Sequence, residues 1–335
     1  MRNIFEKKQY LDCPHLKHSL HFFYDEIRAC CSNVPGPIFY PNFEGGNIDW
    51  DYIYSLRKNY YKDIDSFFSE TSIPRECLKC VDSKTNLKNK KNKKFPNLVN
   101  RIYFQNNMSC NAKCTYCVFS EEERGYKYGV LPIVKSLIDK SLLAKDASIF
   151  MSGGEPTISP EFEQLLELFI SYLNGRNVEI LTSGIKYCKS IEDAFVNDKL
   201  KMVVSIDSGT KETYLKIKGV DCFDKVIENL RKYVLASDFA KENITLKYII
   251  VDKENDNIEE IDAFFDVVKS LCVKNVRIDI DYEMKMIQKF DYNSVFNVSE
   301  KFSQYYKNIL FRIKETQYVI TEVLGVINES INSES

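Results

Sequence analysis

The sequence predicts an α/β fold, and two observations lead to that expectation. From Leu98 onward, short runs rich in Val and Ile alternate with segments whose apolar residues recur at helical spacing. Such alternation is typical of a parallel sheet with helices outside it and right-handed crossovers. Six of these units occupy about 190 residues, fewer than the eight-unit barrel requires. The expected architecture is a partial (βα)6 TIM-type barrel, with a small N-terminal cysteine-rich metal-binding module before it and a C-terminal helical extension after it.

The six expected strands follow one another at regular intervals. They are LVNRIYFQ (98–105), ASIFMSGG (147–154), NVEILTSG (177–184), KMVVSIDSG (201–209), ITLKYIIVD (244–252) and VKNVRIDIDY (273–282). A helix is expected from Leu131 to Lys145, and Ser159 with Pro160 provides an N-cap and first position for the next one, SPEFEQLLELFISYL. Several short polar motifs follow these strands, so they are expected at the carboxyl edge of the sheet, where active sites of such folds lie.

The expected domain organisation has four parts. Residues 1–83 form the cysteine-rich module, 84–96 a Lys/Asn-rich linker, 97–290 the partial barrel and 291–335 the helical extension. The run KTNLKNKKNKKF has almost nothing to bury, which favours a solvated linker; a basic patch for a polyanion is the alternative. The helical pattern of the extension is clearest between Glu300 and Ile331.

Composition excludes several classes of function. The chain is 44% hydrophobic and 28% charged, with a formal net charge of -2, so it shows no strong electrostatic preference for nucleic acid or anionic lipid. No apolar run approaches the roughly 20 residues that a membrane helix needs. The start MRNIFEKKQYLDCPH lacks the apolar core of a secretory signal. We therefore expect a cytoplasmic protein without nucleic-acid or membrane partners.

Cysteine spacing points to a metal centre. Eight of the 11 cysteines lie in the first 117 residues, and clustered cysteines in a reducing compartment usually bind metal. Cys110, Cys114 and Cys117 form a C-x3-C-x2-C triplet with no fourth cysteine beside it. Structural zinc sites need four ligands, whereas an iron-sulfur cluster held by three thiolates leaves one iron free to bind something else. The three lone cysteines further on, Cys188, Cys222 and Cys272, are expected to be small core residues.

The triplet resembles the signature of the radical SAM superfamily, C-x3-C-x-aromatic-C, with Tyr116 as the aromatic residue. The resemblance implies a 4Fe-4S cluster on the three cysteines, with S-adenosylmethionine (SAM) chelating the fourth iron. It further implies that one electron, from a flavodoxin- or ferredoxin-type donor, cleaves SAM to a 5'-deoxyadenosyl radical that removes a hydrogen atom from a substrate C–H bond. Tyr116 would pack on the adenine or shield the cluster.

Companion motifs extend the resemblance over residues 96–282. GGEP is similar to the family's GGE motif, in which the backbone and Glu155 would meet the methionine ammonium. TSG and SIDSG are similar to the elements after the third and fourth strands, and KYIIVDKEND to the element beneath the adenine, where Ile250 and Val251 are candidate apolar contacts. The implied cofactor-binding residues are Tyr116, Gly153, Gly154, Glu155, Ser183, Ser205, Asp207 and Val251.

The N-terminal cysteines predict a second metal site. Its expected ligands are Cys13, one of Cys30 and Cys31, and the C-x2-C pair Cys77 and Cys80. The arrangement resembles the auxiliary-cluster (SPASM or twitch-like) modules of radical SAM enzymes, although those usually follow the barrel. A second 4Fe-4S cluster is the first hypothesis and a structural zinc the alternative, since His15, His18 and His21 also lie in this region.

Substrate identity is not encoded in any of these motifs. The favoured expectation is an enzyme that oxidises or epimerises a small molecule or carbohydrate; a peptide- or protein-modifying maturase and a non-catalytic iron-sulfur scaffold are the alternatives. An epimerase needs a hydrogen-atom donor, and Cys222 is a candidate catalytic residue for that role beside the three signature cysteines. The alternative is that Cys222 is a structural residue at a helix start, packed inward. Asp279, Asp281 and Glu283 alternate along the sixth strand and are either substrate-orienting or simply solvated.

Overall fold

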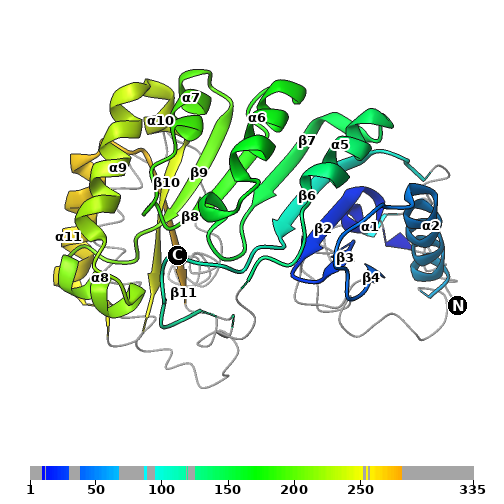
Figure 1. The fold of residues 1–335 in the computed structure, drawn as a ribbon. Coiled ribbons are helices and arrows are strands. Elements are labelled where there is room, and N and C mark those ends of the chain that lie inside the picture. The colour runs from blue at the N-terminus through cyan, green and yellow to red at the C-terminus, as the bar shows by residue number, and fades with distance from the viewer. Residues whose placement is uncertain are drawn as a thin grey trace, which may run out of the picture. The chain divides into compact units, whose positions relative to one another are not determined.

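The computed structural model describes residues 10–11, 13–29, 38–67, 87–88, 95–117, 119, 125–251, 254–255 and 257–280. The chain divides into two compact units (Figure 1). The first comprises Met1–Met108, Gly125–Gly153 and Ser171–Asn177, and the second Ser109–Arg124, Gly154–Ile170 and Val178–Ser335. Strand hydrogen bonding gives a mostly parallel sheet that does not close, so the predicted α/β class and partial barrel are confirmed.

In the described part of the first unit, five strands of the larger sheet lie in the order β7-β6-β2-β3-β4, and β1 and β5 form a separate two-stranded sheet. Its elements are β1 (Tyr10–Leu11), α1 (Pro14–His18), β2 (Ser19–Phe23), β3 (Glu26–Arg28), β4 (Ile38–Tyr40), α2 (Trp50–Phe67), β5 (Leu87–Lys88), β6 (Val99–Gln105), α5 (Leu131–Asp139) and β7 (Leu143–Met151). Strands β2, β6 and β7 are parallel, and β3 and β4 are antiparallel to their neighbours. Alternate β6 side chains are buried, and Phe104 stacks on Phe22 with ring centroids 5.3 Å apart, which joins the two strands in one core.

The second unit carries four parallel strands in the order β8-β9-β10-β11. Its elements are η1 (Pro156–Ile158), α6 (Phe162–Tyr172), β8 (Val178–Thr182), α7 (Lys189–Val196), β9 (Leu200–Ser205), α8 (Lys211–Lys218), α9 (Phe223–Ala236), α10 (Asp238–Asn243), β10 (Ile244–Ile250), α11 (Ile258–Ser270) and β11 (Asn275–Ile280). Helices α7, α9 and α10 pack against one another (Figure 1). This βα succession brings the ends of β8, β9 and β10 to one edge.

All six expected strands are present, but two expected helix boundaries were wrong. The helix from Leu131 ends at Asp139 instead of Lys145, because Ser141 adopts a left-handed conformation (φ 54°) and the chain turns into β7. Ser159 does not begin α6. It ends the short helix η1, whose N-cap is Glu155, and α6 starts at Phe162.

The expected boundary at residue 83 does not separate two sheets. Strands β2, β3 and β4 come from the expected N-terminal module, yet β2 pairs directly with β6. The expected linker also contains β5, which pairs with β1. Cys13 is half-buried at the start of α1; the other expected ligands, Cys30, Cys77 and Cys80, lie outside the described residues, as do Cys31 and the expected helical extension at 291–335. Both metal hypotheses for this region therefore stay predictions.

The lone cysteines differ in burial. Cys188 is buried, as expected, whereas Cys272 is exposed in a left-handed turn (φ 52°) after α11, so the prediction of a core residue was wrong there. Cys222 is only half-buried. Among the described residues, no helix is long and apolar enough to cross a membrane.

Gly209, in the loop after β9, leads to a prediction about packing. A Cβ atom at this position would lie 2.2 Å from the backbone nitrogen of Phe264 and 2.5 Å from the Cβ of Ala263. Because helix backbone cannot yield as a side chain can, Gly209→Ala is expected to lower the free energy of unfolding by about 3 kcal/mol in urea titrations. Gly175→Ala is the control, since its Cβ meets open space at a left-handed φ of 66° and is expected to cost about 1 kcal/mol. Equal losses in the two variants would contradict this packing.

Candidate functional site

The loop that carries the cysteine triplet is fixed by its own backbone. The Lys113 amide donates to the carbonyl of Lys218 (2.8 Å), and the Thr115 amide donates to the carbonyl of Ile217 (2.9 Å), both at the end of α8. At the other end of the loop, the Glu155 amide donates to the carbonyl of Ser109 (2.7 Å). The loop therefore rests between the end of α8 and the GGEP turn, although it has no regular secondary structure.

The three thiols of the triplet lie within electrostatic reach of one another. Cys110 and Cys114 are half-buried and Cys117 is exposed. Burial raises the pKa of Cys110, and the charges of Glu155 and the other two cysteines raise it further. Burial also raises the pKa of Cys114, where the positive charge of Lys218 acts in the opposite direction. Binding of iron would oppose this effect, because iron stabilises the thiolate form of a cysteine over the thiol form.

The three cysteines of the loop fit a 4Fe-4S cluster. No three His, Cys, Asp or Glu side chains converge on one metal position within the part of the chain that the structure describes. In a 4Fe-4S cluster each cysteine binds a different iron atom, so its ligands need not converge on one point. Three free thiols on one loop fit that requirement.

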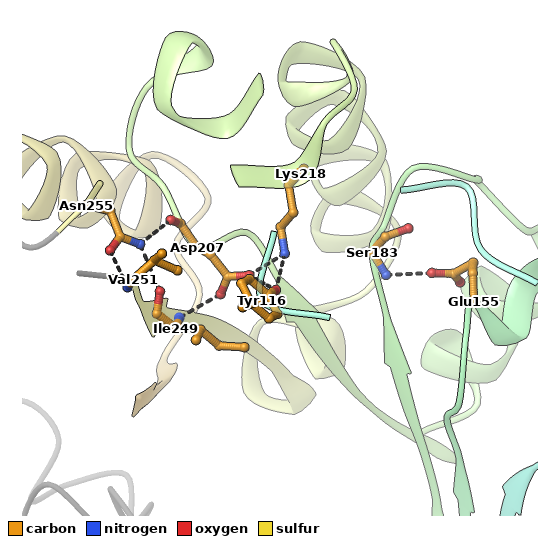
Figure 2. Close-up of polar contacts among 8 residues, drawn as sticks. All are labelled: Tyr116, Glu155, Ser183, Asp207, Lys218, Ile249, Val251 and Asn255. Atoms are coloured by element: carbon orange, nitrogen blue, oxygen red, sulfur yellow. Dashed lines mark hydrogen bonds and ion pairs between the residues drawn. The ribbon is translucent and has the colours of Figure 1, made fainter. Parts of the chain in front are cut away.

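Glu155 is buried and orders the turn after β7. Its Oε1 accepts hydrogen bonds from the Thr157 amide (3.1 Å) and from the hydroxyls of Thr157 (2.5 Å) and Thr182 (2.6 Å). Its Oε2 accepts from the Ser183 amide (2.7 Å), as Figure 2 shows. The Ser183 hydroxyl in turn donates to Asn111 Oδ1 in the cysteine loop (3.0 Å). The structure thus brings together the triplet, Glu155 and Ser183 as the sequence predicted, with Thr182 and Asn111 as additional partners.

Glycine is required at the first position of GGEP. Gly153 has a φ of 107°, and a Cβ there would lie 2.8 Å from the carbonyl oxygen of Asn107. The turn after β7 can therefore pass close to the backbone at the end of β6 only without a side chain. Gly154, beside it, begins the segment that leads to Glu155.

Asp207 is fully buried, and protein groups already bind both of its carboxylate oxygens. Oδ1 accepts from the Ile249 amide (2.7 Å), while Oδ2 accepts from the Tyr116 hydroxyl and forms an ion pair with Lys218 (Figure 2). The implied role of Asp207 in cofactor binding stays a prediction. Asp207 joins the cysteine loop to β10 from within.

Tyr116 contributes its hydroxyl to this network. Burial and the neighbouring charge of Asp207 raise the pKa of Tyr116 well above its usual value, so the phenol keeps its proton and donates a hydrogen bond to Asp207. Its ring is half-buried beside the cysteine loop. The predicted choice between packing on adenine and shielding the cluster stays a prediction.

Asn255 orders the end of β10. Its Nδ2 donates to the carbonyls of Asp207 (2.7 Å) and Ile249 (2.8 Å), and its Oδ1 accepts from the Val251 amide (2.8 Å) (Figure 2). Val251 is half-buried at this strand end, which suits the predicted apolar contact. Ser205, the last residue of β9, is also half-buried.

The remaining candidates lie elsewhere in the second unit. Cys222 is the N-cap residue of α9, so its place at a helix start is as expected. Its side chain makes no capping hydrogen bond. Its role as a hydrogen-atom donor stays a prediction. Asp279 lies on β11, whereas Asp281 and Glu283 fall outside the described residues.

Comparison with known proteins agrees with this geometry. The family model described as "Radical SAM superfamily" matches residues 108–266, a range that contains the cysteine loop, Glu155, Asp207 and Val251. Residues 108–266 thus match the radical SAM superfamily model over a little under half of the chain. That family implies SAM and a 4Fe-4S cluster.

The curated relatives of this chain are partial matches. A probable GTP 3',8-cyclase of Saccharolobus islandicus is 28% identical over 179 residues, which are 50% of this chain and 53% of that protein. The GTP 3',8-cyclase of Mannheimia succiniciproducens is 26% identical over 190 residues, 54% of this chain and 53% of that protein. The chain thus spans about half the length of these relatives.

Among solved structures, Streptococcus suis SuiB bound to its precursor peptide SuiA has a TM-score of 0.50. The match covers 83% of this chain and 55% of that one, with 14% sequence identity. Similarity at this level shows the fold alone. It agrees with the unclosed, mostly parallel sheet of the radical SAM partial barrel.

Proposed function

We propose that Cys110, Cys114 and Cys117 hold a 4Fe-4S cluster at which the protein cleaves SAM reductively and removes a hydrogen atom from a small-molecule substrate. The observation that carries the proposal is the cysteine loop itself. Its three thiols are free, and its backbone is bonded to Ile217, Lys218 and Glu155. Preorganised ligands of this kind lower the cost of binding a cluster, because the loop needs no reordering.

When bound, cluster and SAM supply a carbon radical strong enough to break an unactivated C–H bond, after one electron arrives from a flavodoxin- or ferredoxin-type donor. The chain's own residues orient the reactants. Ser183 and Glu155 fix the end of β8 against the cysteine loop, where the methionine part of SAM would lie. Val251, on the ordered end of β10, offers an apolar surface to the adenine.

The names of the curated relatives favour a small-molecule substrate. GTP 3',8-cyclases act, as their name states, on a nucleotide. Because each match spans about half of the relative, we extend only the substrate class to this chain. Three net reactions are therefore candidates: oxidation and epimerisation, which the sequence favoured, and ring closure. Analysis of the product distinguishes them.

We also propose a second 4Fe-4S cluster, on Cys13, Cys30, Cys77 and Cys80, with zinc as the alternative. The support is the cysteine spacing, together with the half-buried position of Cys13 at the start of α1. Such a cluster would accept an electron from a product radical or bind the substrate.

The direct test uses anaerobically reconstituted protein with SAM, a chemical reductant and deuterated candidate substrates. We expect 5'-deoxyadenosine release even without substrate, and deuterium in that product when the correct small molecule is present. Nucleotides and sugar phosphates form one group of candidates, and short peptides the other. Absence of 5'-deoxyadenosine from cluster-loaded protein would support a scaffold instead, and deuterium transfer from peptides alone would support a maturase.

A further inference from the structure

The end of α8 contacts the cysteine loop through two backbone hydrogen bonds and, in addition, through close packing. Gly219, the left-handed C-cap of α8 (φ 65°), passes so close to the loop that a Cβ there would lie 3.0 Å from both the Cβ and the carbonyl oxygen of Lys113. Helix end and loop are thus in van der Waals contact between the first two signature cysteines. The side chain just before this glycine is Lys218.

Lys218 is a buried cation. Its side chain is 2% exposed, and its Nζ donates to the Tyr116 hydroxyl (2.7 Å) and pairs with Asp207. The carboxylate of Asp207 and the hydroxyl of Tyr116 replace the water that burial removes from this group. The ammonium group is therefore held charged beside the loop at neutral pH.

The ammonium group of Lys218 lies beside the cysteine loop. Its hydrogen-bond partner Tyr116 stands between Cys114 and Cys117 in that loop. The Lys113 and Thr115 amides, on either side of Cys114, donate to the carbonyls of Lys218 and Ile217 and hold the helix end against the loop. The ion pair therefore places a buried positive charge next to the cysteines. Burial removes the screening that salt exerts on surface charges.

We propose that Lys218 is a positioning residue that raises the reduction potential of the cluster on Cys110, Cys114 and Cys117, with Asp207 and Tyr116 holding its ammonium group in place. The inference rests on the proposed function, because it needs the cluster to be there. Reduction adds negative charge to the cluster, so a buried cation nearby stabilises the reduced cluster relative to the oxidised one. Iron-sulfur potentials respond to net charge and hydrogen bonding around the sulfurs in this manner.

The test is a redox titration of the SAM-free, cluster-loaded protein, followed by electron paramagnetic resonance. The decisive comparison is between Asp207→Asn, which keeps the cation, and the double variant Asp207→Asn/Lys218→Met, which lacks both charges. We expect the single variant to have the higher potential, by about tenfold in the reduction equilibrium, or about 59 mV for one electron. Loss of Asp207 alone is expected to raise the potential above that of the wild type.

This design separates charge from structural damage. Both variants lose the same ion pair, so a role in loop docking alone would leave their potentials equal and overturn the inference. Lys216→Met, an exposed change two residues earlier on α8, is the matched control and is expected to keep the wild-type potential. If the double variant binds no iron, Lys218→Gln, which keeps a donor without the charge, is compared with the wild type. A lower potential supports the proposal, and an unchanged one overturns it. Wild-type protein without a cluster would instead refute the proposed function.

Discussion

Replacing Cys110, Cys114 and Cys117 together by alanine is expected to abolish reductive cleavage of SAM. The three thiolates are the only ligands proposed for this cluster, and without it no electron reaches the sulfonium. The cysteine loop makes its backbone hydrogen bonds to Ile217, Lys218 and Glu155 through main-chain atoms, which the substitutions leave in place. We therefore expect a folded protein whose 5'-deoxyadenosine release falls to background, measured by chromatography after anaerobic incubation with SAM and dithionite.

The same variant reports on the N-terminal cysteines. If these hold a second cluster, wild-type protein contains about eight iron atoms per chain and the triple variant about four. Zinc in place of the remaining iron would favour the structural alternative. Cys272→Ser is the control, because this exposed cysteine lies after α11 and outside the loop. Persistent SAM cleavage in the triple variant would refute the assignment of the cluster to these three cysteines.

The parts of the site that the sequence predicted are those with a local signal. The spacing of Cys110, Cys114 and Cys117 is visible in eight residues, and GGEP, TSG and SIDSG each follow a strand that its own β-branched residues predict. Because parallel strands end at one edge, the chain order of these motifs was enough to bring them together. Gly153 illustrates the point, since its φ of 107° belongs to the turn that directly follows β7.

The parts that the sequence did not predict depend on contacts between distant segments. Lys216 and Lys218 look alike in KETYLKIKG, yet the first is exposed and the second is buried against Asp207 and Tyr116, which lie 11 and 102 residues away. Gly219 after Lys218 was the one available signal, since a glycine there predicts a helix end. Asn255 was hidden in the polar run KEND, where nothing marks the residue that bonds back to β10.

Asp207 shows that a motif can be placed correctly while its contacts are not predicted. SIDSG was placed correctly at the end of β9, but burial decides whether a carboxylate faces a ligand or the protein, and sequence gives no measure of burial for a single acid. The N-terminal strands are a similar case. The parallel pairing of β2 with β6 joins residues 82 positions apart in the chain, such as Ser19 and Arg101, and no local pattern specifies such a partner.

Glu155→Gln is expected to weaken both the fold and SAM binding. Each oxygen of Glu155 accepts hydrogen bonds from N–H or O–H donors, so the amide group of glutamine would face a donor in either orientation. Because the site is buried, the amide of Ser183 or of Thr157 would lose its partner. We expect the free energy of unfolding in urea to fall by about 2 to 3 kcal/mol. SAM affinity, measured by equilibrium dialysis of the cluster-loaded protein, is expected to fall at least about tenfold, because the end of β8 loses its anchor.

Glu163→Gln provides the matched control for this prediction. It makes the same chemical change on α6, eight residues further on, at an exposed side chain. Surface substitutions of this kind change stability by less than about 0.5 kcal/mol, so both measurements should stay at the wild-type value. If Glu155→Gln lowered stability but left SAM affinity unchanged, Glu155 would be a structural cap for η1 alone. Loss of affinity at full stability would show that the carboxylate acts on SAM directly, and the two readouts together therefore separate the anchor from the ligand contact.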